Sequence, residues 1–445
     1  MKHTHEIRDP IHTFIRVSSE ERRVIDSPAF QRLRNIHQLA TTFLLYPGAT
    51  HRRFEHSLGV MELASRVFDV VTMKENVLND DVDRILPQDD HQRHYWRQTV
   101  RIAALLHDVG HLPFSHAGEE KLLPEGWDHE RLTYNIICSN QIAPLLDNLK
   151  LNAPDVARLA VGPKKYKEYA PGNSVFSDWE AILSEIITGD AFGVDRMDYL
   201  LRDSHHAGVG YGRFDHHRLI DSLRILPFTR DESLEPALGV DQGGIHGAEA
   251  LLLARYFMFT QLYFHPVRRI YDIHLLDFLS QWLKGGQFST KVDKHLEMTD
   301  NEVMAAILSA ARKPAAAGHD SARRITLREH FRLLYERNPN DVKVNPEAVE
   351  AIHAAAQNEF GEQNVRCDVI PAKTKGYQFP VVTHDRRIVS SLDISDTLNK
   401  IPPATVGYVF IDPVVREKAH QWLESNRNTI IKEPAGEGDN ETATT

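Results

Sequence analysis

Histidine and aspartate gather in four short segments of the chain, and these residue types can bind metal ions and transfer protons. The segments are residues 51–57, 107–116, 128–130 and 195–203. The pair His107-Asp108 is the most informative, because it ends a strongly apolar run that begins at Val100. Polar groups at a buried helix end need a partner. The next question is therefore which group hydrogen-bonds to, or is coordinated by, His107 and Asp108.

A divalent metal ion is one answer. Adjacent helical residues point about 100° apart, so His107 and Asp108 cannot share a partner on one helix face, whereas both can contact a small ion near the helix end. Two imidazoles with two carboxylates suit Fe, Mn, Mg or Zn. The alternative is a core histidine with satisfied hydrogen bonds followed by a turn aspartate, and an isolated His-Asp pair does not decide between the two.

The elements that must position these residues are mostly helical over residues 14–290. Ser27-Pro28 predicts a helix start, and the run from Val100 to His107 predicts a buried helix end, stopped by Gly110 and Pro113. Further helices are predicted at residues 179–187, 194–202 and 247–283, and β-prone runs at 369–372, 387–391 and 406–411. We predict a mainly α chain with a core at residues 1–312, a linker at 313–319, a smaller α+β region at 320–432 and a disordered tail at 433–445.

The composition of the chain excludes some classes of function. The 445 residues carry 52 Lys+Arg against 62 Asp+Glu, a net charge of −10. This balance argues against a general nucleic-acid binder, although it is compatible with a local basic pocket for one phosphate-rich molecule. Two cysteines are too few for a disulfide framework, and neither a secretory signal nor a membrane-spanning run stands out. We expect a cytoplasmic protein that needs neither a membrane nor a nucleic acid.

Taken together, the segments resemble the HD-domain phosphohydrolases, specifically the deoxynucleoside triphosphate triphosphohydrolase branch. The matching strings follow the family's order over roughly residues 6–290: Asp9-Pro10-Ile11-His12, Phe30-Gln31-Arg32-Leu33-Arg34, Gln38-Leu39, Tyr46-Pro47-Gly48-Ala49, Arg53-Phe54-Glu55-His56-Ser57-Leu58-Gly59-Val60, His107-Asp108-Val109-Gly110-His111, Pro113-Phe114-Ser115-His116, Asp195-Arg196-Met197-Asp198-Tyr199 and Arg202-Asp203-Ser204-His205-His206. The resemblance is to the bacterial type, which lacks a sterile alpha motif domain, and it implies an HD-type helical bundle.

The resemblance also implies roles near the metal. The ligands of one divalent cation would be His56, His107, Asp108 and Asp195. His129, with Glu130 beside it, matches the catalytic histidine, and a neighbouring carboxylate would help to keep it charged. His111 is expected in the catalytic set as well, and His116 matches a histidine that lines the substrate.

Substrate contacts form a second group of expectations. Arg53 lies three residues before His56, so on a helix both face one site, and Arg255 interrupts an apolar helix; both match positions that contact phosphates, and Arg196 matches a basic family position. The spacing of Asp195, Tyr199 and Asp203 places them on one helix face. By resemblance Tyr199 packs where a ribose 2′-hydroxyl would clash, Asp203 and Gln38 bind the 3′-hydroxyl, and Tyr263 stacks on the base.

Regulation and assembly are expected by analogy only. Asp26, Gln31 and Arg34 resemble residues that bind a guanine nucleotide at an activator site in the vertebrate relative, with a dNTP or GTP as activator. The same string also fits simple packing of the first helix. Family members form homotetramers or larger rings, so we expect a homo-oligomer.

The leading hypothesis is therefore hydrolysis of deoxynucleoside triphosphates, dGTP among them, to deoxynucleoside and inorganic triphosphate, by metal-hydroxide attack on the α-phosphorus. One alternative keeps the fold but changes the substrate to a nucleoside monophosphate, a cyclic nucleotide or guanosine tetraphosphate. Another is a nucleotide sensor without turnover.

Overall fold

The computed structural model describes residues 4–114, 119–169, 175–230, 233–371 and 378–432. The chain forms two compact units, each built from separate stretches. The first unit comprises Met1–Phe259, Leu279–Ala306 and Thr374–Pro402, and the second comprises Thr260–Phe278, Ile307–Lys373 and Pro403–Thr445. The domain boundaries drawn from the sequence stay a prediction, and the contacts group the chain differently from them.

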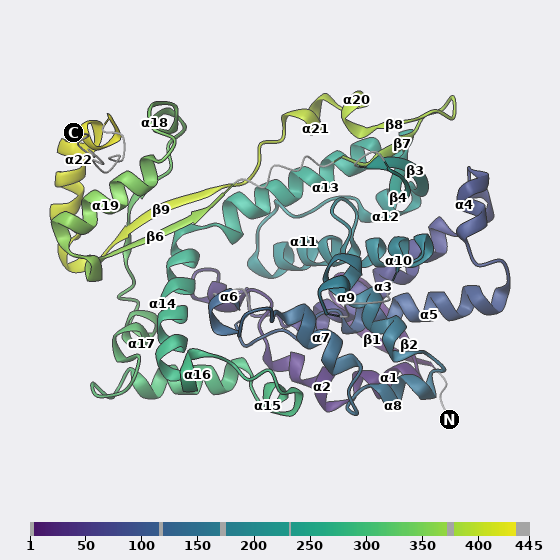
Figure 1. Cartoon of the computed structure of the whole chain (residues 1–445), viewed down its shortest axis with the longest axis horizontal. Coiled ribbons are helices and arrows are strands. Elements are labelled where there is room, and N and C mark those ends of the chain that lie inside the picture. Colours follow the sequence, from purple (N-terminus) through teal and green to yellow (C-terminus); the bar gives the residue numbers. More distant parts are fainter. Residues whose placement is uncertain (1–3, 115–118, 170–174, 231–232, 372–377, 433–445) are drawn as a thin grey trace, which may run out of the picture. The chain divides into compact units, whose positions relative to one another are not determined.

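The first unit is mainly helical (Figure 1). Its helices are α1 (Ser19–Ile25), α2 (Pro28–Gln31), α3 (Arg53–Val71), α4 (Asp80–Ile85), α5 (Asp90–Leu106), α6 (Glu119–Leu122), α7 (His129–Ile137), α8 (Ala143–Asn148), α9 (Ala153–Tyr169), α10 (Asp178–Thr188), α11 (Val194–Ala207), α12 (His216–Asp221), α13 (Ile245–Met258), α15 (Val292–Leu296), α20 (Ser391–Ile394) and α21 (Asp396–Lys400). Two more, α14 (Pro266–Trp282) and α16 (Asp300–Ala310), carry residues of both units.

Helices α3 and α5 bring polar side chains into the core. Residues on nearly every face of α3 are buried, as in a central helix, and it packs against α5 and α11. In α5 the first half is polar and largely exposed, whereas every residue from Thr99 to Leu106 is buried. The helix therefore ends inside the unit, with His107 as its C-cap. This confirms the buried helix end that the apolar run predicts.

Two small sheets belong to the first unit. Strands β1 (Thr4–Asp9) and β2 (Thr13–Ser18) form an antiparallel hairpin. The other sheet has the order β3-β4-β7-β8, with β3 (Leu223–Arg230), β4 (Ser233–Asp241), β7 (Pro380–Val382) and β8 (Ile388–Ser390). Because β7 pairs with β4 in parallel, residues near 380 and 388 join the first unit.

The second unit contains the sheet β5-β9-β6, which joins β5 (Arg332–Glu336), β9 (Val406–Ile411) and β6 (Val365–Ile370) in antiparallel register. Its helices are α17 (His319–Thr326), α18 (Pro339–Val344), α19 (Ala348–Phe360) and α22 (Arg416–Lys432). Figure 1 shows α19 and α22 beside this sheet, and Ile352, Val409 and Leu423 share one apolar cluster there. The prediction of a mainly helical chain whose C-terminal region contains small sheets is confirmed.

Residues 14–290 are mostly helical, as expected, although strands β2, β3 and β4 also fall within this stretch. The linker predicted at 313–319 stays a prediction; in the structure these residues belong to the second unit, where an added Cβ at Gly318 would lie 2.6 Å from the ring of Phe278. The β-prone run at 406–411 is β9, and the predicted disordered tail lies outside the described residues.

Gly59 allows α3 and α11 to approach closely, and this contact can be tested. A Cβ at this position would lie 1.9 Å from Oδ1 of Asp198 and 2.5 Å from Nη2 of Arg202. We expect Gly59→Ala to destabilise the protein by about 1–3 kcal/mol through overpacking, measured as the midpoint of thermal unfolding. Gly247→Ala is the matched control, because that helical glycine has no neighbour closer than 3.6 Å. A Gly59→Ala midpoint as high as that of the control would contradict the close approach.

Candidate metal centre

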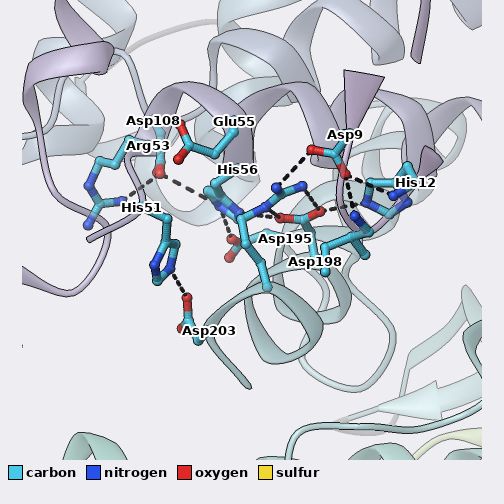
Figure 2. Close-up of polar contacts among 12 residues, drawn as sticks. Asp9, His12, His51, Arg53, Glu55, His56, Asp108, Asp195, Asp198 and Asp203 are labelled. Atoms are coloured by element: carbon cyan, nitrogen blue, oxygen red, sulfur yellow. Dashed lines mark hydrogen bonds and ion pairs between the residues drawn. The ribbon is translucent and has the colours of Figure 1, made fainter. Parts of the chain in front are cut away.

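The four side chains predicted as metal ligands meet inside the first unit. Ligand atoms of His56 on α3, His107 at the end of α5 and Asp195 on α11 lie within 4.8 Å of one another. Asp108 completes the group, because its Oδ1 lies 3.3 Å from Nε2 of His107 and its Oδ2 lies 3.7 Å from Nε2 of His56. His56 is fully buried, and Figure 2 shows its ring among the carboxylates of Asp108, Asp195 and Asp198.

The donor atoms of this cluster fit a divalent cation. Nδ1 of His107 donates to the carbonyl oxygen of Ala104 at 2.8 Å, so Nε2 carries a lone pair, and this buried nitrogen has no hydrogen bond among the described residues. Nδ1 of His56 similarly faces the carboxylate of Asp198 at 2.8 Å, which leaves Nε2 to face the cluster. Two imidazole lone pairs and two carboxylates within a few ångströms are a donor set for Fe, Mn, Mg or Zn.

The pKa values of the cluster residues are shifted because negatively charged groups outnumber positively charged ones there. Burial lowers the pKa of His56, but its hydrogen bonds to Asp195 and Asp198 outweigh burial and raise that pKa to about 10. The pKa of Asp195 is lowered, because contacts with His107 and His56 outweigh its burial. One guanidinium, that of Arg53, reaches Asp108 with Nη1 at 2.5 Å from Oδ2. A site that holds protons this firmly would hold a divalent cation in their place.

A pair of stacked histidines borders the cluster. The rings of His111 and His129 lie 3.9 Å apart between centroids and 18° from parallel, and Nε2 of His111 lies 3.0 Å from Oδ1 of Asp108. Gly110 makes this possible, because a Cβ there would lie 2.4 Å from the carbonyl oxygen of His129. Helix α7 can therefore begin, at His129, against the loop that follows α5.

The two histidines differ in charge. Nδ1 of His129 lies 2.9 Å from Oε1 of Glu119 and 3.3 Å from Oε2 of Glu130. Burial lowers the pKa of His129, but Glu119 and then Glu130 outweigh it and raise the pKa to about 9. Burial, Arg53 and His129 together hold the pKa of His111 well below its ordinary value. At neutral pH a charged imidazole thus stacks on a neutral one beside Asp108.

The three arginines predicted to bind the substrate lie in two places. Arg53 is buried against Asp108, next to the cluster. Arg196 and Arg255 both reach the turn after α10: Arg196 donates to the carbonyl oxygens of Thr188 and Gly189, and Nη1 of Arg255 donates to the carbonyl oxygen of Asp190 at 3.0 Å. The structure therefore assigns Arg196 a structural contact that the sequence did not indicate.

The predicted sugar-binding residues also lie close to the cluster. Burial raises the pKa of Tyr199 to about 12, with Arg255, Arg196, Asp195 and Asp203 close enough to influence it. Asp203 is buried and accepts from Nε2 of His51 at 2.7 Å, which Figure 2 shows to one side of His56. The backbone N–H of Gln38 donates to the carbonyl oxygen of His51, and the buried Oε1 of Gln38 has no hydrogen bond among the described residues.

The remaining predicted residues are less informative. His116 lies outside the described residues. Tyr263 belongs to the second unit, at the end of a π-helical turn (Phe259–Tyr263), and its contact with a base stays a prediction. Gln31 accepts from Nε of Arg34 at 2.8 Å, and Asp26 accepts from Nε of Arg22 at 3.2 Å. These local contacts agree with packing of the first helices, and the activator role of Asp26, Gln31 and Arg34 stays a prediction.

Sequence reasoning missed several residues that hold the site together. Besides Glu119 and His51, Asp300 accepts from the backbone N–H groups of His37 and Phe114, and it lies 2.6 Å from Nδ1 of His37. It thereby joins the segment that carries Gln38 to the loop that follows His111. The sequence did carry a signal, without an assigned role, for Asp9-Pro10-Ile11-His12 and Asp198 as family strings and for His51 as the first residue of the segment 51–57.

Comparison with known proteins agrees with this geometry. The HD domain model matches residues 53–203, which carry all four clustered side chains, and the model described as an HD associated region matches residues 214–373. This is an HD-domain protein. The His/Asp cluster suits a divalent metal ion.

Several known proteins are similar to this chain. The chain is 35% identical over 275 residues to the uncharacterized protein YwfO of Bacillus subtilis, covering 61% of this chain and 54% of that protein. It is 29% identical over 384 residues to the human deoxynucleoside triphosphate triphosphohydrolase SAMHD1, covering 78% of this chain and 57% of SAMHD1. A crystal structure of a hypothetical protein from Aquifex aeolicus matches with a TM-score of 0.76 and 32% identity, over 94% of this chain and all of that one.

The chain spans about half the length of the curated relatives that it matches, such as YwfO and SAMHD1. Within the part of the chain that the structure describes, none of the helices has the length and apolarity that crossing a bilayer requires.

The carboxylate that keeps His129 charged can be tested directly. Glu119→Gln removes the carboxylate that raises the pKa of His129 most, so we expect that pKa to fall from about 9 toward 6.5. NMR titration of the His129 ring measures it. Glu130→Gln is the control, and it should lower the pKa less, because Glu130 lies farther from Nδ1. Equal shifts in the two variants would contradict the assignment of Glu119 as the main partner.

Proposed function

We propose that the protein hydrolyses deoxynucleoside triphosphates, dGTP among them, to deoxynucleoside and inorganic triphosphate with the help of one divalent cation. The observation that carries the proposal is the meeting of four metal-type donors from α3, α11 and the end of α5 beside a charged, carboxylate-held histidine. The similarity to SAMHD1, whose name states this activity, supports the substrate class.

The proposed reaction balances as a simple hydrolysis. Water adds to the α-phosphorus, the bond between this phosphorus and the 5′-oxygen breaks, and the 5′-oxygen takes up a proton. A divalent cation held by His56, His107, Asp108 and Asp195 would lower the pKa of a coordinated water and neutralise charge on the phosphate. The deoxynucleoside then leaves with its 5′-hydroxyl, and the three phosphates leave together.

His129 suits the role of proton donor. A pKa of about 9 keeps its ring protonated at neutral pH, and Glu119 holds Nδ1 so that Nε2 can face the departing oxygen. Glu130 adds to the charge that keeps the proton in place. His111, whose pKa is low, stays neutral beside Asp108 and His129, with its Nε2 3.0 Å from Oδ1 of Asp108.

The proposed substrate contacts follow from position and charge. Arg53 offers a guanidinium beside Asp108, and Arg196 and Arg255 bring two more to the turn after α10, as a triphosphate chain requires. In this proposal Tyr199, Asp203 and Gln38 contact the deoxyribose, which is supported by the charged neighbours that Tyr199 shares with the cluster and by the contact of Asp203 with His51. We further propose that His116 contacts the phosphates and that Tyr263 stacks on the base. We also propose that an activating dNTP or GTP binds at Asp26, Gln31 and Arg34. The protein is proposed to form a homo-oligomer such as a tetramer.

A product assay tests the proposal. Purified protein is incubated with each of the four dNTPs and with Mn²⁺, Mg²⁺, Fe²⁺ or Zn²⁺, with and without added dGTP, and the products are separated by ion-exchange chromatography. We expect deoxynucleoside and inorganic triphosphate in equal amounts, and no turnover in the double variant His107→Ala, Asp108→Ala. Release of orthophosphate or pyrophosphate would contradict the proposed bond cleavage. Turnover of a monophosphate or cyclic nucleotide instead would move the substrate to another class.

The role proposed for Tyr199 makes a separate prediction. Because its ring would occupy the space of a ribose 2′-hydroxyl, Tyr199→Ala should raise kcat/KM for GTP relative to dGTP by about tenfold or more. Tyr199→Phe keeps the ring and should keep the wild-type preference. The measurement is kcat/KM for both nucleotides in the three proteins. An unchanged ratio in Tyr199→Ala would remove Tyr199 from sugar selection.

A further inference from the structure

The carboxylate of Asp198 contacts His56 of the metal cluster, and hydrogen-bond donors occupy both of its oxygens. Its Oδ2 lies 2.8 Å from Nδ1 of His56 and accepts from Nε of Arg202 at 2.8 Å, whereas its Oδ1 lies 2.7 Å from Nε2 of His12 and accepts from Nη2 of Arg202 at 2.9 Å. The side chains of Asp198, Arg202, His12 and His56 have no exposed surface. Figure 2 shows this carboxylate between His56 on one side and His12 on the other.

The turn between β1 and β2 supplies the far side of this network. Asp9 accepts with Oδ1 from the backbone N–H groups of Ile11 and His12, and with Oδ2 from Nη1 of Arg202 at 2.8 Å. The turn ends at Thr13, whose φ of 67° lies in the left-handed region that a β-branched residue rarely adopts. Such a conformation persists when surrounding contacts fix it, and here the contacts fix His12 and Asp9 against α11.

The hydrogen bonds determine where the protons lie. Both oxygens of Asp198 can only accept while it is ionised, so His12 must donate from Nε2 and His56 must donate from Nδ1. The network then contains two carboxylates and one guanidinium, and with neutral imidazoles its net charge is −1. In a buried environment this charge acts on the ring of His56, fixes its tautomer and makes Nε2 a stronger electron donor.

We propose that the turn between β1 and β2 is a positioning element of the metal centre: Asp9 and His12, through Asp198 and Arg202, fix the tautomer and orientation of His56 and thereby set the affinity for the cation. Both residues lie outside residues 53–203, which the HD domain model matches. The inference rests on the proposed cation site but not on the proposed substrate, because metal binding can be measured without a nucleotide.

The alternative is that this turn only stabilises the fold, and the two possibilities differ in measurable ways. A purely structural turn would change unfolding but leave the metal dissociation constant of the folded protein unchanged. A positioning turn changes that constant in folded protein. If the turn is a positioning element, the metal dissociation constant should also differ between substitutions of His12 that keep a donor at the position of Nε2 and those that remove it.

The experiment titrates Mn²⁺ into the metal-free full-length chain by isothermal calorimetry, without nucleotide. We expect His12→Phe, which keeps a ring but loses the donor, to weaken Mn²⁺ binding about 10- to 100-fold, as expected for loss of a group that orients a metal ligand. His12→Gln keeps an amide donor near the same place and should bind within about threefold of the wild type.

His5 provides a matched control, since it lies on the same hairpin and its Nε2 contacts only Ser19 among the described residues, while Nδ1 contacts Arg22. His5→Phe should leave Mn²⁺ binding unchanged. Wild-type Mn²⁺ affinity in folded His12→Phe, or equal weakening in His12→Phe and His12→Gln, would overturn the proposal.

Asp9→Asn decides the matter if His12→Phe does not fold, because the amide keeps an acceptor for the turn but removes the charge that faces Arg202. Weaker Mn²⁺ binding in folded Asp9→Asn would support the proposal, and wild-type binding would overturn it. If Mn²⁺ binding depends on His12 but no dNTP is hydrolysed, the proposed substrate fails and the role of the turn stands.

Discussion

The carboxylate of Asp198 joins three parts of the chain that are far apart in sequence. It contacts His56 on α3, Arg202 on its own helix α11, and His12 in the turn between β1 and β2. A carboxylate without exposed surface is stable only when donors occupy its oxygens, so these three parts cannot shift independently. Gly59 leaves room for this contact on α3. The same helix α11 carries Asp195, Tyr199 and Asp203, so the interaction also positions the residues proposed to bind metal and sugar.

The buried charges around this interaction explain the different states of the histidines. Carboxylates surround His56 and His129, and the pKa values of both are raised. His111 lies between Arg53 and the charged ring of His129, and its pKa is lowered. The site therefore has a neutral histidine next to Asp108 and a charged one stacked on it. That gradient suits a reaction in which a phosphate approaches from the metal side and a proton is delivered to the leaving oxygen.

The sequence predicted the local features of this site better than its long-range partners. The apolar run before His107 and the cap at Ser27-Pro28 are local signals, and both helices form where they indicate. The partners of His129, Asp203 and His37 are not local: Glu119 lies on another helix, and His51 and Asp300 contact residues 152 and 263 positions away. A single sequence carries no pairing information over such distances. The strands β3 and β4 were missed because each contains a proline, and proline within a run argues against a strand. The two prolines, Pro227 and Pro236, face each other in the register of these strands.

The central claim is that His56, His107, Asp108 and Asp195 hold one cation. Anomalous X-ray diffraction from crystals grown with Mn²⁺, recorded at wavelengths that favour manganese, measures this directly. The account predicts one strong peak per chain, about 2.0–2.3 Å from Nε2 of His56 and of His107 and from one oxygen each of Asp108 and Asp195. A peak elsewhere in the chain, or no peak at full Mn²⁺ loading, would contradict it.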